Sequence, residues 1–141
     1  MSHNLKRHLL HALRLAPVFV FSLLVVTPGQ YALADASGCS RFGIDGLTCI
    51  AVKGHGLRIY SIKARFDKVT TLCNWRYDIV YTQTNGTNYS TRKGPTHPGC
   101  NFSGDLPVTY TPYTNVRTGK VCAQLYSDGS YVDAACVSLF P

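Results

Sequence analysis

Two histidines with lysines nearby are the residues whose types and spacing come closest to a catalytic set. His55 follows Lys53 by two positions, and His97 follows Lys93 by four. Two imidazoles can act as general base and general acid in phosphodiester cleavage, and an ammonium group can stabilise the developing charge. The set predicts, as an alternative function, a small secreted toxin or ribonuclease that uses His55, His97 and Lys93. Both histidines stand in Gly- or Pro-rich stretches, and no pattern brings the two stretches together.

Other hydrolytic sets are poorly represented. The chain contains no Glu, so a two-carboxylate glycosidase site would depend on Asp alone. A Ser or Cys nucleophile needs a histidine and a third, orienting group, and no G-x-S-x-G elbow is present. We therefore expect a protein that is not an enzyme.

Tyrosines close to basic residues give the most specific surface hypothesis. Tyrosine and arginine are common where a protein contacts another macromolecule. The predicted binding residues are Tyr89, Arg92, Lys93, His97, Tyr113 and Arg117. They predict contact with an extracellular protein or polysaccharide through surface loops. The alternative is that the nine tyrosines simply furnish the core and the strand surfaces.

Six cysteines predict a disulfide framework. They lie at Cys39, Cys49, Cys73, Cys100, Cys122 and Cys136. Six cysteines allow fifteen pairings, of which we favour the sequential one. No C-x-x-C motif occurs and only two histidines follow residue 36, so we expect neither a metal site nor another cofactor.

Residues 73–81 are expected to form the central strand. Cys73, Trp75, Tyr77, Ile79 and Tyr81 recur at every second position, as in a strand with one buried face. The residues between them, Asn74, Arg76 and Asp78, should face solvent.

Further apolar or alternating segments predict additional strands, at 47–52, 57–66, 108–116, 121–126 and 131–139. Pro112 places the segment 108–116 at a sheet edge, and residues 37–46 should form a loop or irregular edge strand. Residues 92–100 contain two prolines and two glycines and are expected to form a long exposed loop.

Turn signals join these strands. Asn85-Gly86 predicts a hairpin with a type I′ turn. At Asp128-Gly129, a two-residue loop would leave Cys122 and Cys136 on opposite faces. Their pairing therefore requires an odd loop with a bulge, or, if the loop is even, a bulge elsewhere in the hairpin. Asn85, Asn88 and Asn101 stand in N-x-S/T sequons, which matter only if the source glycosylates proteins.

Together these signals predict an all-β fold. Six to eight short strands without helical periodicity favour a small antiparallel β-sandwich of Ig-like or Greek-key type, stapled by about three disulfides, with a small barrel as the second choice. Residues 37–141 are expected to form this single domain.

Residues 1–36 have the features of a secretory signal peptide. A basic leader precedes an apolar run at 15–26, and Ala32, Ala34 and Ala36 give A-x-A spacings that predict cleavage after Ala34 or Ala36. The run is too short to span a bilayer. We expect a secreted, extracellular protein with no membrane attachment once the signal is removed.

The charge left after cleavage is mildly basic. Residues 37–141 hold 11 Lys and Arg against 6 Asp, a formal net charge of +5. The basic residues are scattered, so we expect a soluble monomer with no specific nucleic acid partner, although an acidic polymer remains open as a partner.

The triplet Trp75-Arg76-Tyr77 resembles the one found in the proteinaceous α-amylase inhibitors of streptomycetes, which are small, secreted, disulfide-bonded β-sandwiches. In that family the triplet protrudes at a turn and enters the active site of the enzyme. The resemblance implies a hydrolase inhibitor that uses Trp75, Arg76 and Tyr77. The alternation of residues 73–81 instead predicts a core strand, with only Arg76 of the triplet pointing outward.

Three longer motifs are similar to a group of small exported actinobacterial proteins without a defined activity. They are C-x-W-R-Y-D-I-V-Y-x-x-T-N-G, G-P-T-H-P-G-C and V-C-A-Q-L-Y-x-D-G-x-Y-V-x-x-A-C-V, which span most of residues 73–137. The resemblance implies export, disulfide bonds and a β-sandwich. It carries over no catalytic residues.

Overall fold

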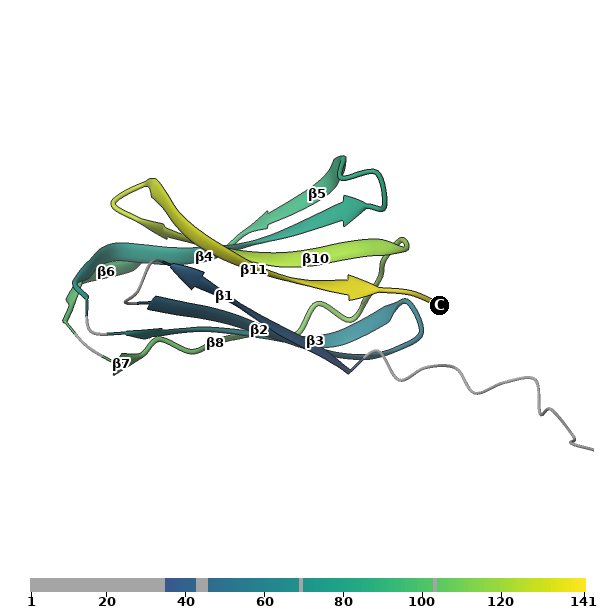
Figure 1. The fold of residues 1–141 in the computed structure, drawn as a ribbon, viewed down its shortest axis with the longest axis horizontal. Coiled ribbons are helices and arrows are strands. Elements are labelled where there is room, and N and C mark those ends of the chain that lie inside the picture. The colour runs from purple at the N-terminus through teal and green to yellow at the C-terminus, as the bar shows by residue number, and fades with distance from the viewer. Residues whose placement is uncertain (1–34, 43–45, 69, 103) are drawn as a thin grey trace, which may run out of the picture.

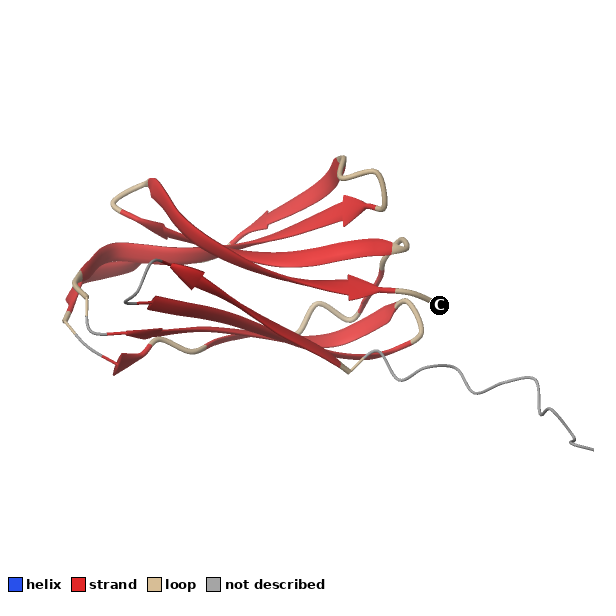
Figure 2. Ribbon diagram, viewed as in Figure 1, coloured by secondary structure: helices blue, strands red, loops and turns tan. Residues whose placement is uncertain are grey.

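The computed structural model describes residues 35–42, 46–68, 70–102 and 104–141. The predicted signal peptide therefore lies outside the described residues, apart from its last two positions. The described residues form strands joined by turns and contain no helix of membrane-spanning length and hydropathy (Figure 2). The strands are β1 Ala36–Phe42, β2 Gly46–His55, β3 Arg58–Lys68, β4 Leu72–Gln83, β5 Asn88–Lys93, β6 His97–Asn101, β7 Gly104–Asp105, β8 Val108–Tyr110, β9 Thr114–Asn115, β10 Gly119–Ser127 and β11 Ser130–Leu139.

Two antiparallel sheets face each other as the predicted β-sandwich (Figure 1). The first sheet has the order β1-β2-β3, and the short strands β7, β8 and β9 all pair with β3. The second has the order β11-β10-β4-β5, with β6 also paired to β4. On one side β1 approaches β11 so closely that a Cβ on Gly38 would stand 2.8 Å from the carbonyl oxygen of Cys136. This contact joins the two sheets along one edge.

The core lies between the sheets and follows the predicted alternation. Trp75, Tyr77, Ile79 and Tyr81 of β4 are all buried. They pack against buried side chains of the first sheet, including Ile50, Val52, Ile59, Ile62 and Phe66. The central strand is therefore confirmed.

The opposite face of β4 differs from the prediction. Asn74 is exposed, but Asp78 is only 4% exposed and lies beside Arg76. The Asp78 carboxylate accepts hydrogen bonds from Arg76 and from the Gly94 N–H, and Arg76 itself lies over the Tyr126 ring. The prediction of a solvated row was wrong for Asp78, and the Arg76 side chain keeps only 15% exposure.

The sequential disulfide pairing is confirmed: Cys39–Cys49, Cys73–Cys100 and Cys122–Cys136. The disulfides close loops of 10, 27 and 14 residues. In the loop-closure model each lowers the conformational entropy of the unfolded chain and so stabilises the fold by about 3 kcal/mol. Three disulfides indicate an oxidising environment.

The odd loop predicted between β10 and β11 was wrong, although the disulfide that motivated it forms. Asp128 and Gly129 make a two-residue turn with φ of 47° and 79°, as in a type I′ turn. Val132 then bulges, because Tyr126 pairs with Tyr131 while Leu125 pairs with Asp133. The bulge restores the parity that places Cys122 opposite Cys136.

Three other local predictions need correction. Gly86 has a positive φ of 84° but Asn85 does not, and Gln83 and Thr87 close a three-residue loop, so the β4–β5 turn is not type I′. The predicted long loop 92–100 is mostly strand: residues 92–93 end β5, and residues 97–100 belong to β6. In β3 the face reverses at Tyr60, because Lys53 pairs with Ser61 while Gly54 pairs with Ile59. Tyr60 therefore points outward, with 38% exposure.

Candidate functional site

The two histidines of the predicted catalytic set are not brought together. His55 ends β2 beside the hairpin to β3, whereas His97 begins β6 and pairs with Trp75 near the start of β4. Because β3 runs from the His55 end to the β4 start over eleven residues, the two sites stand at opposite ends of the sandwich and on different sheets (Figure 1). Lys93 lies in β5, opposite Asp78 of β4. The arrangement supplies no paired acid and base from these residues.

The Trp75-Arg76-Tyr77 triplet lies within β4. Trp75 and Tyr77 are buried, and Tyr77 donates a hydrogen bond to the carbonyl oxygen of Leu106 at 3.2 Å. Arg76 is held at 4.5 Å over the ring of Tyr126 and at 3.1 Å from Asp78. Trp75 and Tyr77 are buried as the alternation predicts, whereas Arg76, which was expected to face solvent, is held between Tyr126 and Asp78. The triplet lies within a strand and does not protrude at a turn.

Three of the predicted binding residues and one further tyrosine lie together along one open side of the sandwich. There, side chains of β5 in the second sheet contact β8 and the segment after β9 in the first sheet. We call this surface the edge cluster, and it consists of Tyr89, Arg92, Tyr110 and Arg117. The Arg117 backbone N–H donates to the Tyr89 hydroxyl at 3.0 Å, and its guanidinium lies 5.3 Å from the centre of the Tyr89 ring. Tyr89 in turn packs on Tyr81, with ring centroids 6.2 Å apart.

The other half of the edge cluster is Arg92 and Tyr110. The Arg92 guanidinium lies 5.9 Å from the centre of the Tyr110 ring, and the Tyr110 hydroxyl donates to the Tyr77 carbonyl oxygen at 2.9 Å. Burial, helped by the nearby Asp78 carboxylate, raises the pKa of Tyr110, whereas Arg92 opposes this shift. The Tyr110 hydroxyl therefore stays protonated, and its neutral ring lies beneath the exposed Arg92 guanidinium.

The guanidinium groups of the edge cluster are available to a partner. Arg92 and Arg117 are exposed, and neither forms an ion pair with a carboxylate within the described ranges. Each is fixed over a tyrosine ring, and a cation over an aromatic face gains about 0.5–1 kcal/mol at an exposed position. The cluster therefore presents two oriented positive charges beside aromatic surface.

The remaining predicted binding residues lie elsewhere. Tyr113 is 66% exposed in the segment between β8 and β9 and lies 6.2 Å from Tyr60, ring centre to ring centre. His97 is stacked on Trp75. Sequence reasoning missed Tyr60, because in the predicted strand 57–66 it stands two positions before Ile62, and regular alternation places both side chains on the same face. The glycine at position 54, within a strand, was the available signal for a bulge.

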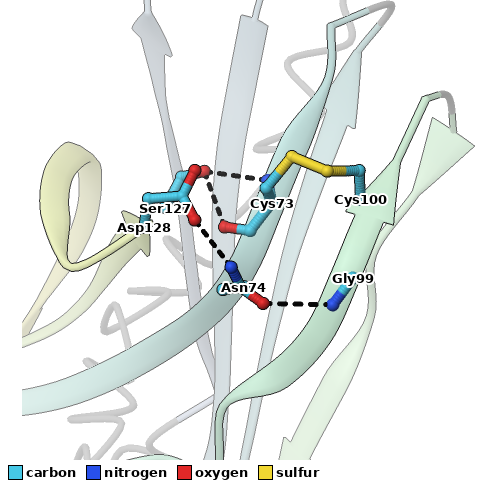
Figure 3. Close-up of a disulfide and its surroundings, with 6 residues drawn as sticks. All are labelled: Cys73, Asn74, Gly99, Cys100, Ser127 and Asp128. Carbon is cyan, nitrogen blue, oxygen red and sulfur yellow. Dashed lines mark hydrogen bonds between the residues drawn. A yellow bond between two sulfur atoms is a disulfide. The ribbon is translucent and has the colours of Figure 1, made fainter.

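A polar network around Cys73 fixes the end of the molecule where His97 lies (Figure 3). The Asn74 side chain donates to Asp128 at 2.7 Å and accepts from the Gly99 N–H at 3.1 Å. Ser127 accepts from the Cys73 N–H and donates to the Cys73 carbonyl oxygen, both at 2.9 Å. With the Cys73–Cys100 disulfide, these bonds tie β4, β6 and the β10–β11 turn together, which is a structural role.

No family model, curated protein or solved structure matches this chain.

Proposed function

We propose that this chain is an exported, non-enzymatic protein that binds an extracellular protein through the edge cluster of Tyr89, Arg92, Tyr110 and Arg117. The observation that carries the proposal is that two exposed guanidinium groups without carboxylate partners in the described residues are each held over a tyrosine ring. Tyrosine and arginine are, with tryptophan, the residues enriched among the energetically dominant positions of protein interfaces. The partner surface should be acidic.

Preorganisation supports binding over a purely solvating role for these arginines. A free arginine side chain loses rotamer freedom when it is immobilised at an interface, at a cost of about 0.5–1.5 kcal/mol. The stacking of Arg92 and Arg117 and the hydrogen bond to Tyr89 reduce this cost before the partner arrives. The adjacent β5 is an edge strand whose residues are mostly exposed, so a partner can approach without displacing covering structure.

Export is part of the proposal, and it rests on the leader at residues 1–36 together with the three disulfides. Ala36 begins β1 and pairs with Val52. Cleavage after Ala34 keeps this pair, whereas cleavage after Ala36 removes it. The first site is therefore the one more compatible with the complete β1 strand, and N-terminal sequencing of the exported product tests the choice.

Affinity capture with matched variants tests the binding function. The disulfide-bonded protein is immobilised and exposed to culture fluid of the organism that makes it, and the captured protein is purified and its affinity measured. The double variant Arg92→Gln/Arg117→Gln should weaken binding at least tenfold, which corresponds to about 1.4 kcal/mol. The control Lys120→Gln removes an exposed charge on β10 and should bind as the unchanged protein does. Equal capture by the double variant contradicts the proposal.

A further inference from the structure

The outer face of the first sheet carries a second, separate concentration of positive charge. Lys63 and Arg65 of β3 are exposed and alternate with the buried Ala64 and Phe66, so they point away from the core. Lys53 of β2 lies on the same face, opposite Ser61. Arg58 is exposed at the start of β3. The only carboxylate that forms a described ion pair here is Asp67, at 3.9 Å from Arg65.

A hollow of about 300 Å³ lies on this face beside Lys63 and Arg65. Small residues make its floor, because Ser37, Ala51 and Lys63 form one row across β1, β2 and β3, while Cys39, Cys49 and Arg65 form the next. The long side chains of Lys63 and Arg65 therefore stand beside a hollow whose base consists of small side chains. Its volume is at the lower end of the range found for ligand-binding pockets in proteins.

An exposed aromatic pair lies beside these cations: Tyr60 stands on β3 between Arg58 and Lys63, and Tyr113, from the segment between β8 and β9, packs against it. Tyr60 and Tyr113 are 38% and 66% exposed, with ring planes inclined by 40°. Both depend on unusual backbone: Tyr60 is turned outward by the bulge in β3, and Tyr113 has a positive φ of 43°. Left-handed backbone costs a residue other than glycine about 1–2 kcal/mol and is concentrated at functional sites.

We propose that this face binds a linear polyuronate, a polysaccharide with a carboxylate on each sugar ring. Sugar rings pack their C–H faces on Tyr60 and Tyr113, and the carboxylates of neighbouring rings reach Lys63 and Arg65. Alternate residues of a strand stand about 7 Å apart, so Lys63 and Arg65 meet successive charges of a polymer rather than one small anion. Arg65 offers the planar fork that matches a carboxylate.

The position of the rings favours a polyuronate over other polyanions. A surface for single-stranded nucleic acid interleaves aromatic rings with its cations so that successive bases stack. Here the rings lie at one end, and the hollow beside Lys63 and Arg65 is otherwise lined by Ser37, Ile50, Ala51 and the Cys39–Cys49 disulfide. A polyphosphate has no ring to place on the tyrosines. Each unit of a polyuronate carries both a sugar ring, which can pack on the tyrosine pair, and a carboxylate, which can pair with the adjacent cations.

Calorimetric titration of the disulfide-bonded protein with hexagalacturonate tests the proposal. We expect binding that Lys63→Gln/Arg65→Gln weakens at least tenfold. Tyr113→Gly, which removes the ring and suits the positive φ, should weaken it several-fold without lowering the melting temperature. Arg92→Gln/Arg117→Gln, in the edge cluster, should leave it unchanged, which separates this site from the proposed protein-binding function.

Several results would overturn the assignment. One is the absence of binding, and another is equal affinity in the Lys63→Gln/Arg65→Gln variant. Affinity for a polyphosphate or a single-stranded RNA of equal charge that matches that for hexagalacturonate would show a general polyanion surface instead. Unchanged affinity for hexagalacturonate in Tyr113→Gly would show that the Tyr113 ring does not contact the sugar.

Discussion

The imidazole of His97 lies parallel to the indole of Trp75, with ring centroids 4.0 Å apart and planes inclined by 9°. Trp75 is the only tryptophan of the chain and is 8% exposed. His97 thus covers the indole at the end of the core where β6 pairs with β4. The His97 Nε2 is buried and has no hydrogen-bond partner among the described residues. His97, predicted from the sequence as a binding or catalytic residue, therefore packs on the core through this ring contact.

Substitutions at His97 separate stacking from polarity. His97→Phe keeps a ring over Trp75 and removes a buried, unpaired nitrogen, whose burial costs about 1–3 kcal/mol. We expect it to unfold at the same or a higher denaturant concentration than the unchanged protein. His97→Ala loses the stacking, worth about 0.5–1.5 kcal/mol, and should shift the Trp75 emission to longer wavelength. An alanine variant more stable than the phenylalanine variant would contradict this account.

Asn74 is expected to stabilise the fold through both its backbone and its side chain. It has a positive φ of 47° and bridges Gly99 and Asp128. Asn74→Gly removes both hydrogen bonds but tolerates the backbone, whereas Asn74→Ala also adds the left-handed penalty. Chemical denaturation should therefore find the alanine variant less stable than the glycine variant by about 1 kcal/mol. Equal stabilities would show that the backbone conformation relaxes.

The main features of the fold were predictable because they rest on local patterns. The alternation of residues 73–81 indicated the central strand, and the even number of cysteines after residue 36 indicated three disulfides. The bulge at Val132 has no local signal that fixes its position, because it is set by pairing with β10. The bulge at Tyr60 had one, the glycine at position 54 within the neighbouring strand. Strand β6 contains Pro98 and reads as a loop until the Cys73–Cys100 bridge places it beside β4.

The candidate site was predictable in part. Tyr89, Arg92 and Arg117 were proposed from residue type alone, and the structure places all three on the same edge of the sandwich. Which residues would join them depended on long-range packing. Arg117 meets Tyr89 across 28 positions, and no local pattern encodes that contact. Lys93 and Tyr113 have equally suitable side chains but point to other faces.

The buried carboxylate of Asp78 should contribute much more to stability than an exposed one. It accepts hydrogen bonds from Arg76 at 3.1 Å and from the Gly94 N–H at 3.2 Å. Asp78→Asn leaves the Arg76 charge without its partner, and breaking a buried pair costs about 3 kcal/mol. The matched control is Asp67→Asn, whose side chain is 56% exposed and 3.9 Å from Arg65, and which should change the unfolding free energy by less than about 0.5 kcal/mol. Similar losses in urea denaturation for both variants would contradict the distinction.

Buried tyrosines should make the fold sensitive to alkali. Burial, reinforced by the charge of Asp105, raises the pKa of Tyr77 far above its usual value, and burial also raises the pKa of Tyr81 and of Tyr110. In the unfolded chain tyrosine ionises near pH 10. Above about pH 10 the unfolded chain therefore releases protons that the folded chain keeps, and the free energy of unfolding falls as the pH rises. Below that pH these tyrosines do not make the free energy of unfolding depend on pH.

Tyr77→Phe isolates the largest of these contributions. At pH 8 it should lose about 1 kcal/mol, because the hydrogen bond to Leu106 disappears. Between about pH 10 and pH 11 its stability should fall less steeply than that of the unchanged protein, by up to about 1.4 kcal/mol, since one group that ionises only on unfolding has been removed. Urea denaturation across this range measures both effects, with Tyr113→Phe as the exposed control. Parallel pH profiles for the unchanged protein and Tyr77→Phe would show that this hydroxyl does not set the alkaline limit, whatever the cost at pH 8.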